Sequence, residues 1–369
     1  MKALVTAGLS DYKLRTKLVG LLDNEQIDEI VLVRRAPLRS SHPKLKNVNP
    51  RGPFAASRLL YEFWRTWTLW RLAGRGADVV MGIQLVLHGV QAALVGRLRR
   101  IPAVLSVIGD DVHIHLLSWW KRPMLAWSVR QAAAATVMGP ESRRKLCEVG
   151  VPAFKTFEIQ NYQDIGRFRP RGGEIRWDFI FVGDLIPRKR VDALLDAISD
   201  VARAVSGIQL AIVGDGPERH RLETRARELN IENQVDFLGR QEEVEKFLNA
   251  SRAFVLISSI EALPAAAIEA MYCGLPAVLT SVCDIPGLFV HEENALLVSL
   301  DDHSGLVAAL RQMIKDPELY ARLREGALRS RGCHAEKWNS EGQVRRWSEL
   351  LDSVSSSALA SHTGTRKAS

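Results

Sequence analysis

The chain has 369 residues, of which 47% are hydrophobic and 25% charged, the proportions of a globular protein. This composition excludes a disordered or fibrous chain, and the length favours two domains, because single hydrophobic cores stop growing near ~250–300 residues. Four cysteines at no metal-ligand or redox spacing argue against a disulfide framework and for a reducing compartment.

The first half of the chain alternates runs rich in Val, Ile and Leu with segments of helical character. Residues 2–7 form the first run, which is too short for the apolar core of a signal peptide and predicts a strand. The most apolar window, residues 79–96, contains Gln84, His88 and Gln91, so it predicts a strand, a loop and the start of a helix rather than a membrane span. Further strands of this half are expected at 29–35, 77–83, 102–109 and 133–139.

Two segments of this half combine tryptophan with basic residues. Residues 61–75 place three tryptophans at helical spacing among arginines, and residues 118–127 repeat the combination. A helical aromatic stripe is typical of a core, whereas tryptophan with basic residues is typical of helices in a lipid interface, so both interpretations stay open. The candidate membrane or acceptor surface comprises Trp64, Trp67 and Arg71, with Arg65, Trp70, Arg75, Trp119, Trp120, Lys121, Arg122 and Trp127 around them.

Formal charge is distributed unevenly along the chain. Residues 1–172 contain 27 Lys and Arg against 13 Asp and Glu, a charge of +14, whereas the remainder contains 23 against 29, a charge of −6. This asymmetry predicts an anionic partner for the first half. Nucleic acid would suit the charge, but no nucleic-acid motif accompanies it, so an anionic cytoplasmic leaflet is the favoured partner.

Polar residues gather where the strand predicted at 102–109 ends. Asp110, Asp111, His113 and His115 follow it closely, and this is where a general base or a hydroxyl-orienting group would lie. Two histidines at i and i+2 without a further ligand set are weak evidence for a metal, so no metal is expected.

The segment 167–177 interrupts the alternation with Pro, Gly and charge and predicts a linker. Strands of the second half are expected at 178–183, 208–214, 234–239, 252–258 and 275–280. Continuous apolar strands that alternate with helices predict parallel sheets covered on both faces. The expected divisions are a Rossmann-like domain over 1–170, a second over 171–335, a helix over 336–352 that packs back on the first domain, and a disordered tail over 353–369.

Ligands of such sheets bind at the loops that follow the carboxyl ends of the strands. One of these loops reads "EALPAAAIEA" over 261–270. Pro264 fits the first helical position, and the N–H groups of residues 265–267 would then favour an anion such as a phosphate. Glu261 and Glu269 could accept hydrogen bonds from sugar or ribose hydroxyls, although on spacing alone Glu269 is better explained as a solvated helix residue. "GDGP" over 214–217 lacks the third glycine of a dinucleotide-binding pattern and predicts a structural turn.

The ordered series "FVGDLIPRKRVDALLDA" (181–197), "LAIVGDGPERHRLE" (210–223) and "VDFLGR" (235–240), followed by the 261–270 loop, resembles the C-terminal domain of retaining glycosyltransferases of family 4. The resemblance covers the second half closely and the first half loosely. It implies an α/β chain with the GT-B fold, in which two facing Rossmann-like doubly wound domains enclose an inter-domain cleft. The nucleotide-sugar donor would bind mainly to the second domain and the acceptor to the first.

The resemblance also implies roles for individual residues. Glu261 would face the transferred sugar, Glu269 the ribose, and Lys189 the donor diphosphate, while Asp111 would match the family aspartate on the acceptor side, with His113 beside it. The further donor-site candidates are Gly183, Arg188, Pro264 and Ala265. The chain departs from the family at Asp184, where arginine is usual and for which Arg188 or Arg190 would substitute, at Ile108 in place of histidine, and at Cys283 and Asp284 in place of glycines.

These observations predict a retaining hexosyltransferase-like enzyme that moves a sugar from a nucleotide-diphosphate donor to a hydroxyl of a glycan or lipid-linked acceptor, in the synthesis of a cell-surface polysaccharide or glycolipid. Neither cofactor nor metal is expected. The departures keep two alternatives open: a catalytically inactive GT-B subunit that positions a partner, and a nucleotide-sugar epimerase. The expected location is cytoplasmic and peripheral, at the inner face of the cytoplasmic membrane.

Overall fold

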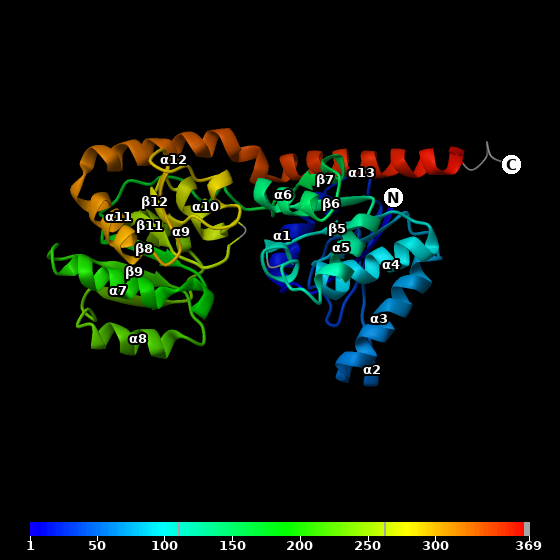
Figure 1. The fold of residues 1–369 in the computed structure, drawn as a ribbon, viewed down its shortest axis with the longest axis horizontal. Helices are drawn as coiled ribbons and strands as arrows, with labels where there is room; N and C mark the ends of the chain where they lie inside the picture. Colours follow the sequence, from blue (N-terminus) through cyan, green and yellow to red (C-terminus); the bar gives the residue numbers. More distant parts are fainter. Residues whose placement is uncertain (110, 262, 365–369) are drawn as a thin grey trace. The chain divides into compact units, whose positions relative to one another are not determined.

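The computed structural model describes residues 1–109, 111–261 and 263–364, with side chains through residue 356, and divides the chain into two compact units (Figure 1). The first unit consists of Met1–Gln163 and Glu336–Ser369, and the second of Asp164–Ala335. Each unit is built around one parallel sheet. Ile83, Leu105 and Phe181, like most strand residues, are buried, as is expected where helices cover both faces of a sheet.

The sheet of the first unit has the strand order β3-β2-β1-β4-β5-β6-β7. Leu4 of β1 lies opposite Val31 of β2 on one side and Val80 of β4 on the other. The strands are β1 Lys2–Ala7, β2 Glu29–Val33, β3 Leu45–Val48, β4 Val79–Ile83, β5 Ala103–Ser106, β6 Ala134–Val137 and β7 Thr156–Glu158. The helices are α1 Asp11–Leu22, α2 Pro53–Ala56, α3 Arg58–Ala73, α4 Val90–Arg99, α5 Arg122–Gln131, α6 Pro140–Glu148 and α13 Ser340–Gly364, with the short turns η1 Leu85–Gly89, η2 Asp111–His115 and η3 Ala153–Lys155.

Successive strand residues point to opposite faces of this sheet, and each face has its own core. Helices α1 and α13 cover one face, where Leu14 and Leu18 pack with Trp347 and Leu350. Helices α3, α4 and α5 cover the other, where buried side chains such as Leu69 pack on the sheet. The first unit is therefore a three-layer structure in which the C-terminal helix completes one layer.

Helix α13 extends beyond the predicted end of the last helix. It continues to Gly364, and Val354 is 1% exposed in the same core as Leu350 and Leu351. The expectation of a disordered tail from residue 353 is corrected for residues 353–364, because Val354 has apolar surface to bury. Residues 365–369 of that expectation lie outside the described part of the chain.

The sheet of the second unit has the order β10-β9-β8-β11-β12-β13. Its strands are β8 Trp177–Val182, β9 Leu210–Val213, β10 Val235–Gly239, β11 Ser251–Leu256, β12 Ala277–Thr280 and β13 Ala295–Val298. Its helices are α7 Val191–Ala202, α8 Arg219–Glu228, α9 Val244–Asn249, α10 Ala265–Tyr272 and α11 His303–Lys315, with the turns η4 Pro187–Lys189 and η5 Ile285–Gly287, and α12 Pro317–Trp338 runs on into the first unit.

In both sheets the order of the strands reverses at one place. In the first sheet, β2 and β3 follow β1 on one side, and the chain then crosses to the other side of β1, where β4 pairs with it. In the second sheet, β9 and β10 follow β8 on one side, and β11 pairs with β8 on the other. Ligands of open parallel sheets bind at the carboxyl ends of the strands at such a switch point. These two places are therefore where the functional side chains should be sought.

Candidate functional site

Lys189 and Glu261 meet at the switch point of the second sheet. Lys189 lies in the turn after β8 and Glu261 in the loop after β11, and the ammonium donates a hydrogen bond to the carboxylate. Their side chains are only 12% and 11% exposed. A partly buried cation that pairs with a carboxylate at this edge of a sheet can exchange that carboxylate for a phosphate.

Backbone contacts fix the loops that carry this pair. The N–H of Ser259 donates to the carbonyl of Arg188 at 2.9 Å, which joins the loop after β11 to the loop after β8. Gly214 has φ 146°, and a Cβ on it would lie 1.9 Å from the carbonyl oxygen of Gly183. Because no side chain fits there, "GDGP" is a structural turn that lets the loops after β8 and β9 pack together.

The start of α10 differs from the sequence prediction in one respect. Pro264 is the residue before the helix, with φ −73° and ψ 117°, and Ala265 is the first helical residue. The N–H of Ala267 donates to the carbonyl of Pro264 at 3.1 Å, so it does not point outward as predicted. The helix begins one residue later than the sequence suggested because Pro264 has an extended backbone. Ala262, in the preceding loop, lies outside the described residues.

Glu269 is half-buried on α10. Burial raises the pKa of its carboxyl to about 7, and the negative charge of Glu245 acts in the same direction, whereas Arg167 opposes it. Arg167 itself donates to Glu245 at 2.7 Å. The simple interpretation of Glu269 as a solvated helix residue is therefore wrong, since its carboxyl is desolvated enough to be partly protonated near neutral pH.

The charged residues around the glycine of the β8 loop are paired. Asp184 lies 3.6 Å from Arg240, which follows β10, and both side chains are largely exposed. Arg190 adopts a left-handed backbone conformation, with φ 53°, and pairs with Asp301 at 2.6 Å. A Cβ on Gly183 would lie 3.6 Å from Cε of Lys189, so this glycine borders the lysine closely.

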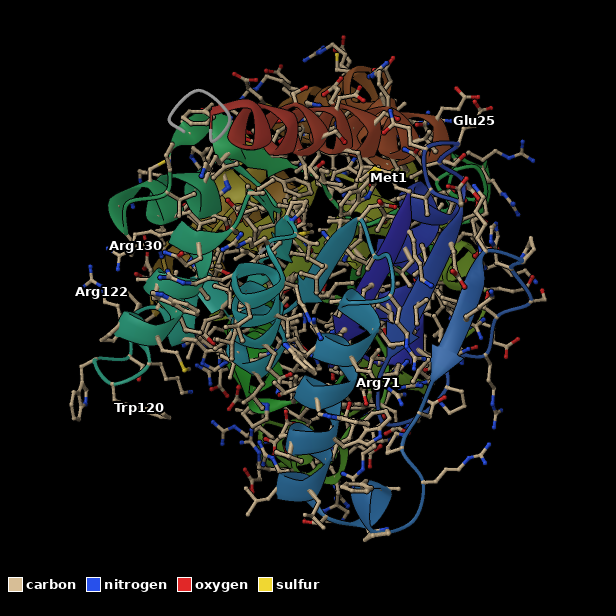
Figure 2. All side chains as sticks on the ribbon, turned by 90° about the vertical axis from the view of Figure 1, so that its right-hand side faces the viewer. Met1, Glu25, Arg71, Trp120, Arg122 and Arg130 are labelled. Carbon is tan, nitrogen blue, oxygen red and sulfur yellow. The ribbon has the colours of Figure 1, made fainter. Side chains whose placement is uncertain are left out.

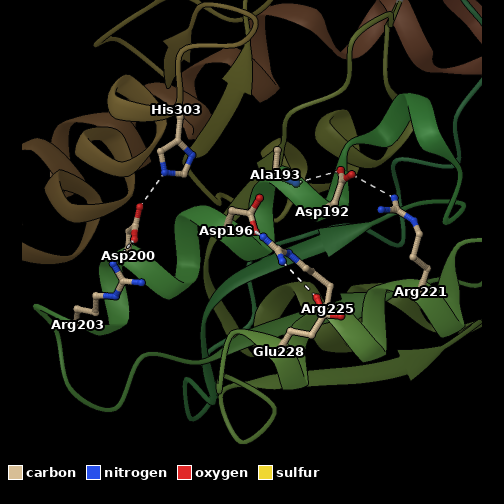
Figure 3. Close-up of polar contacts among 9 residues, drawn as sticks. All are labelled: Asp192, Ala193, Asp196, Asp200, Arg203, Arg221, Arg225, Glu228 and His303. Atoms are coloured by element: carbon tan, nitrogen blue, oxygen red, sulfur yellow. Dashed lines mark hydrogen bonds and ion pairs between the residues drawn. The ribbon is translucent and has the colours of Figure 1, made fainter.

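A groove lies between α7 and α8 of this unit. Asp192 and Asp196 of α7 pair with Arg221 and Arg225 of α8 at 3.1 and 2.8 Å (Figure 3). The groove is lined by Asp192, Asp196, His220, Arg221, Thr224, Arg225 and Glu228. These ion pairs across the groove join two helices on the side of the unit, so we do not regard it as the ligand site.

In the first unit, the described residues predicted around the end of β5 each contact different neighbours. Oδ2 of Asp111 accepts hydrogen bonds from the backbone N–H groups of Leu85 at 2.8 Å and Ile108 at 3.1 Å, so this carboxylate holds two loops together. The imidazole of His113 faces α6, where Nζ of Lys145 lies 2.8 Å from its Nδ1. His115 lies 3.2 Å from Lys121. Asp110 lies outside the described residues.

A cluster that sequence reasoning missed occupies the switch point of the first sheet. Arg65 is 1% exposed, and its guanidinium donates a hydrogen bond to Nε2 of His88 at 3.1 Å. Because Nε2 accepts this bond, Nδ1 of His88 carries the proton and donates to the hydroxyl of Thr6 at 2.8 Å. Burial, with the charge of Arg65, holds the pKa of His88 well below its usual value. Gln84 adjoins this cluster and has a positive backbone φ of 77°. Its Oε1 lies so close to Gly8 that a Cβ on that glycine would be only 2.4 Å away.

The predicted surface on α3 is partly core. Trp64 packs against the core and stacks on Tyr61 with ring centroids 6.1 Å apart. Trp67 is 46% exposed, and the guanidinium of Arg71 lies 4.7 Å from its ring centroid. Trp64 and Trp67 therefore have different roles, which tryptophan composition alone does not distinguish.

In the part of the chain that the structure describes, no helix combines the length and the apolar character that crossing a bilayer requires.

Comparison with known proteins adds two family matches. Residues 167–330 match the family described as glycosyl transferases group 1, and residues 23–161 match the glycosyl transferase 4-like domain. N-acetyl-alpha-D-glucosaminyl L-malate synthase of Bacillus anthracis is 32% identical over 166 residues, which are 45% of this chain and 42% of that protein. The chain thus matches about two fifths of the length of the first curated relatives. The amylovoran biosynthesis glycosyltransferase AmsD of Erwinia amylovora is 24% identical over 92% of this chain and 95% of its own.

Solved structures show the fold. HepE of Anabaena, crystallised with UDP, superposes with a TM-score of 0.79 at 18% identity over 96% of this chain and all of its own. Sucrose-phosphate synthase of Thermosynechococcus elongatus superposes with a TM-score of 0.76 at 17% identity over 97% of this chain and all of its own. These likenesses confirm the predicted α/β GT-B fold.

Proposed function

Because the chain belongs to the family 4 glycosyltransferases of the GT-B fold, we propose that it transfers a sugar from a nucleotide-diphosphate donor to a hydroxyl of a glycan or lipid-linked acceptor. The observation that carries the proposal is the Lys189–Glu261 pair at the switch point of the second sheet. The pathway is the synthesis of a cell-surface polysaccharide or glycolipid. The amylovoran enzyme and a lipopolysaccharide core glycosyltransferase of Rhizobium meliloti among the relatives support it.

The proposed reaction retains the configuration of the transferred sugar. The acceptor oxygen bonds to the anomeric carbon on the face from which the diphosphate leaves, the bond from that carbon to the diphosphate oxygen breaks, and the acceptor proton passes to a donor phosphate oxygen. Lys189 would stabilise the negative charge that develops on the leaving diphosphate, because a fixed cation there needs little reorganisation. Glu261 would accept hydrogen bonds from hydroxyls of the transferred sugar.

The proposal includes further donor contacts and a location. Glu269 would face the ribose, and Gly183, Arg188, Pro264 and Ala265 would border the phosphates. Asp111 and His113 would act on the acceptor side, Asp111 by holding its loop. No cofactor or metal takes part, and the protein would work at the inner face of the cytoplasmic membrane.

Donor binding tests the proposal most directly. HepE structures contain UDP and UDP-glucose, so these are the first probes for calorimetry and thermal stabilisation. A bound ligand at a hundred times its dissociation constant adds about 2.7 kcal/mol to stability. Lys189→Met should weaken UDP binding at least about tenfold, which corresponds to ~1.4 kcal/mol. Lys246→Met is the matched control, because Lys246 is an exposed lysine of the same unit that pairs with Glu243.

Turnover separates the remaining roles. Glu261→Gln should lose transfer to acceptor, whereas Glu243→Gln, an exposed glutamate of the same unit, should keep it. A chain that binds no member of a nucleotide and nucleotide-sugar panel would instead be the inactive GT-B subunit. Conversion of the nucleotide-sugar without any acceptor would identify an epimerase.

A further inference from the structure

Exposed apolar side chains are concentrated in one part of the first unit. Of the 19 large apolar side chains exposed in the described part of the chain, 13 lie between Phe54 and Met124. Scattered exposed apolar residues are normal on a protein surface, but a concentration of them marks an interaction site. The thirteen are Phe54, Leu59, Leu60, Phe63, Trp67, Trp70, Leu94, Leu98, Ile114, Leu117, Trp119, Trp120 and Met124.

Helix α3 carries the centre of this surface. Leu59, Phe63, Trp67 and Trp70 are spaced by four, four and three residues, so they form one stripe along the helix. They are 83%, 69%, 46% and 42% exposed. The opposite face of α3 is buried on the sheet through residues such as Leu69. A helix that is apolar on both faces has a second face that packing in this unit does not explain.

Neighbouring elements extend the stripe. Helix α3 contacts α4, and α4 contacts α5, so the three helices form one layer on the sheet. Leu94 and Leu98 are exposed on α4, and Trp119 and Trp120, in the turn before α5, are 86% and 63% exposed. Figure 2 shows Trp120 projecting outward at the edge of the first unit, on the same side as Arg122 and Arg130.

The charge around these side chains is predominantly positive. Between residues 51 and 130 the exposed basic residues outnumber the exposed acidic ones among the described residues by eight to one, the acid being Asp78. Glu62, on α3 itself, is turned inward, where it pairs with the buried Arg65 and accepts from Gln91 at 3.1 Å. The eight exposed arginines are Arg51, Arg58, Arg71, Arg75, Arg97, Arg100, Arg122 and Arg130.

Three of the four exposed tryptophans of this surface have a cation against the ring. The guanidinium of Arg99 lies 3.7 Å from the ring centroid of Trp70, and Nζ of Lys121 lies 4.9 Å from that of Trp120. The guanidinium of Arg71 lies 4.7 Å from the ring centroid of Trp67. Indole rings with adjacent cations suit the boundary between acyl chains and anionic headgroups, where the ring is half-immersed and the cation meets a phosphate.

We propose that the outer face of α3 and the turn before α5 form a docking surface for an anionic lipid leaflet. Helix α3 lies in the plane of the interface, with Leu59, Phe63, Trp67 and Trp70 toward the acyl chains and the arginines among the headgroups. The predominantly positive charge favours an anionic lipid surface over a protein partner, since a protein surface of mixed charge would gain little from it. This assignment deepens the proposed function, because it brings the unit expected to bind the acceptor to the membrane where a lipid-linked acceptor would be found.

Sedimentation of the full chain with vesicles tests the surface. Binding to vesicles of phosphatidylcholine with 30% phosphatidylglycerol should exceed binding to phosphatidylcholine alone at least about tenfold at low salt, and should weaken at 0.5 M NaCl through screening. The variant Phe63→Ser with Trp67→Ser should reduce binding at least about tenfold. Phe154→Ser is the matched control, because Phe154 is 75% exposed in η3, outside the α3–α5 layer.

Further readouts separate this surface from folding and from donor binding. Both serine variants should keep a cooperative melt, because the replaced side chains are exposed, and should bind UDP as the wild type does. Equal binding to neutral and anionic vesicles, no binding to either, or equal loss in the Phe154→Ser control would overturn the proposal. A wild-type dimer that the double variant converts to monomers would overturn it too, in favour of a protein interface. If the wild type binds no member of the nucleotide and nucleotide-sugar panel, the transferase is refuted and the docking surface still stands.

Discussion

The half-buried carboxyl of Glu269 makes the stability of the second unit depend on pH. Its pKa lies at about 7 in the folded chain against an ordinary value of 4.5. Between these values the folded chain holds a proton that the unfolded chain has released, so the free energy of unfolding falls as pH rises through this window and changes no further above it. At about 1.36 kcal/mol per pKa unit, the fall amounts to at most ~3 kcal/mol.

Glu269→Gln isolates this contribution, because glutamine has nearly the same shape and does not titrate. The stability of wild type relative to the variant should fall by up to ~3 kcal/mol between pH 4.5 and 7.5, which corresponds to a relative shift of roughly 6–12 °C in the melting temperature of a unit of this size. Melts of both proteins across this range measure it. Glu243→Gln, an exposed glutamate on the same unit, should show no such trend. A difference between wild type and Glu269→Gln that does not change with pH would mean that the carboxyl is not desolvated.

Three further substitutions probe the packing described above. Gly214→Ala should cost about 2–3 kcal/mol or more, because its Cβ would collide with the carbonyl of Gly183; an unchanged urea midpoint would contradict the geometry. Trp347→Ala should lower the free energy of unfolding by about 3–5 kcal/mol, since this indole of α13 is 2% exposed and packs with the residues of α1. Hydrogen exchange in α1 should rise in the variant. Unaltered protection would show that α13 is dispensable. Arg65→Ala should cost about 3–5 kcal/mol by leaving Glu62 without its cation, as circular dichroism melts would show; a neutral result would mean that the pair is solvated.

Interior strands could be predicted from the sequence, whereas most edge strands could not. The predicted runs at 2–7, 178–183 and 252–258 correspond to β1, β8 and β11, which are buried on both faces and read as continuous apolar stretches. Of the four edge strands, only β10 was expected; β3, β7 and β13 were missed. These three have only three or four residues each, and β3, "LKNV", is half polar because one side of an edge strand faces solvent.

The candidate site was predictable where topology alone decides it. Lys189 and Glu261 are 72 residues apart, and they meet because β8 and β11 are adjacent at the switch point. The buried arginine was not recognised, although the spacing contained the signal: Tyr61, Arg65, Leu69 and Ala73 follow one another at intervals of four, which puts Arg65 on the buried stripe of α3. We placed Arg65 among the surface cations because an arginine inside a core is rare. Its partner Glu62 lies only three residues away, a spacing that exposed ion pairs on a helix share.

The two switch points differ in a way that separates a ligand site from a structural one. At the first, Arg65 is 1% exposed and has Glu62, Gln91 and His88 around it, so its charge is compensated within the fold. At the second, Lys189 has Glu261 as its ion-pair partner and retains some exposure. Exchanging one carboxylate for a diphosphate at Lys189 leaves Glu261 free to accept hydroxyl hydrogen bonds, so a single event turns a resting ion pair into two ligand contacts. Because Glu261→Gln also removes the resting partner of Lys189, its effect on turnover has to be measured per folded molecule; a loss of activity that matches the loss of folded protein would assign Glu261 a structural role only.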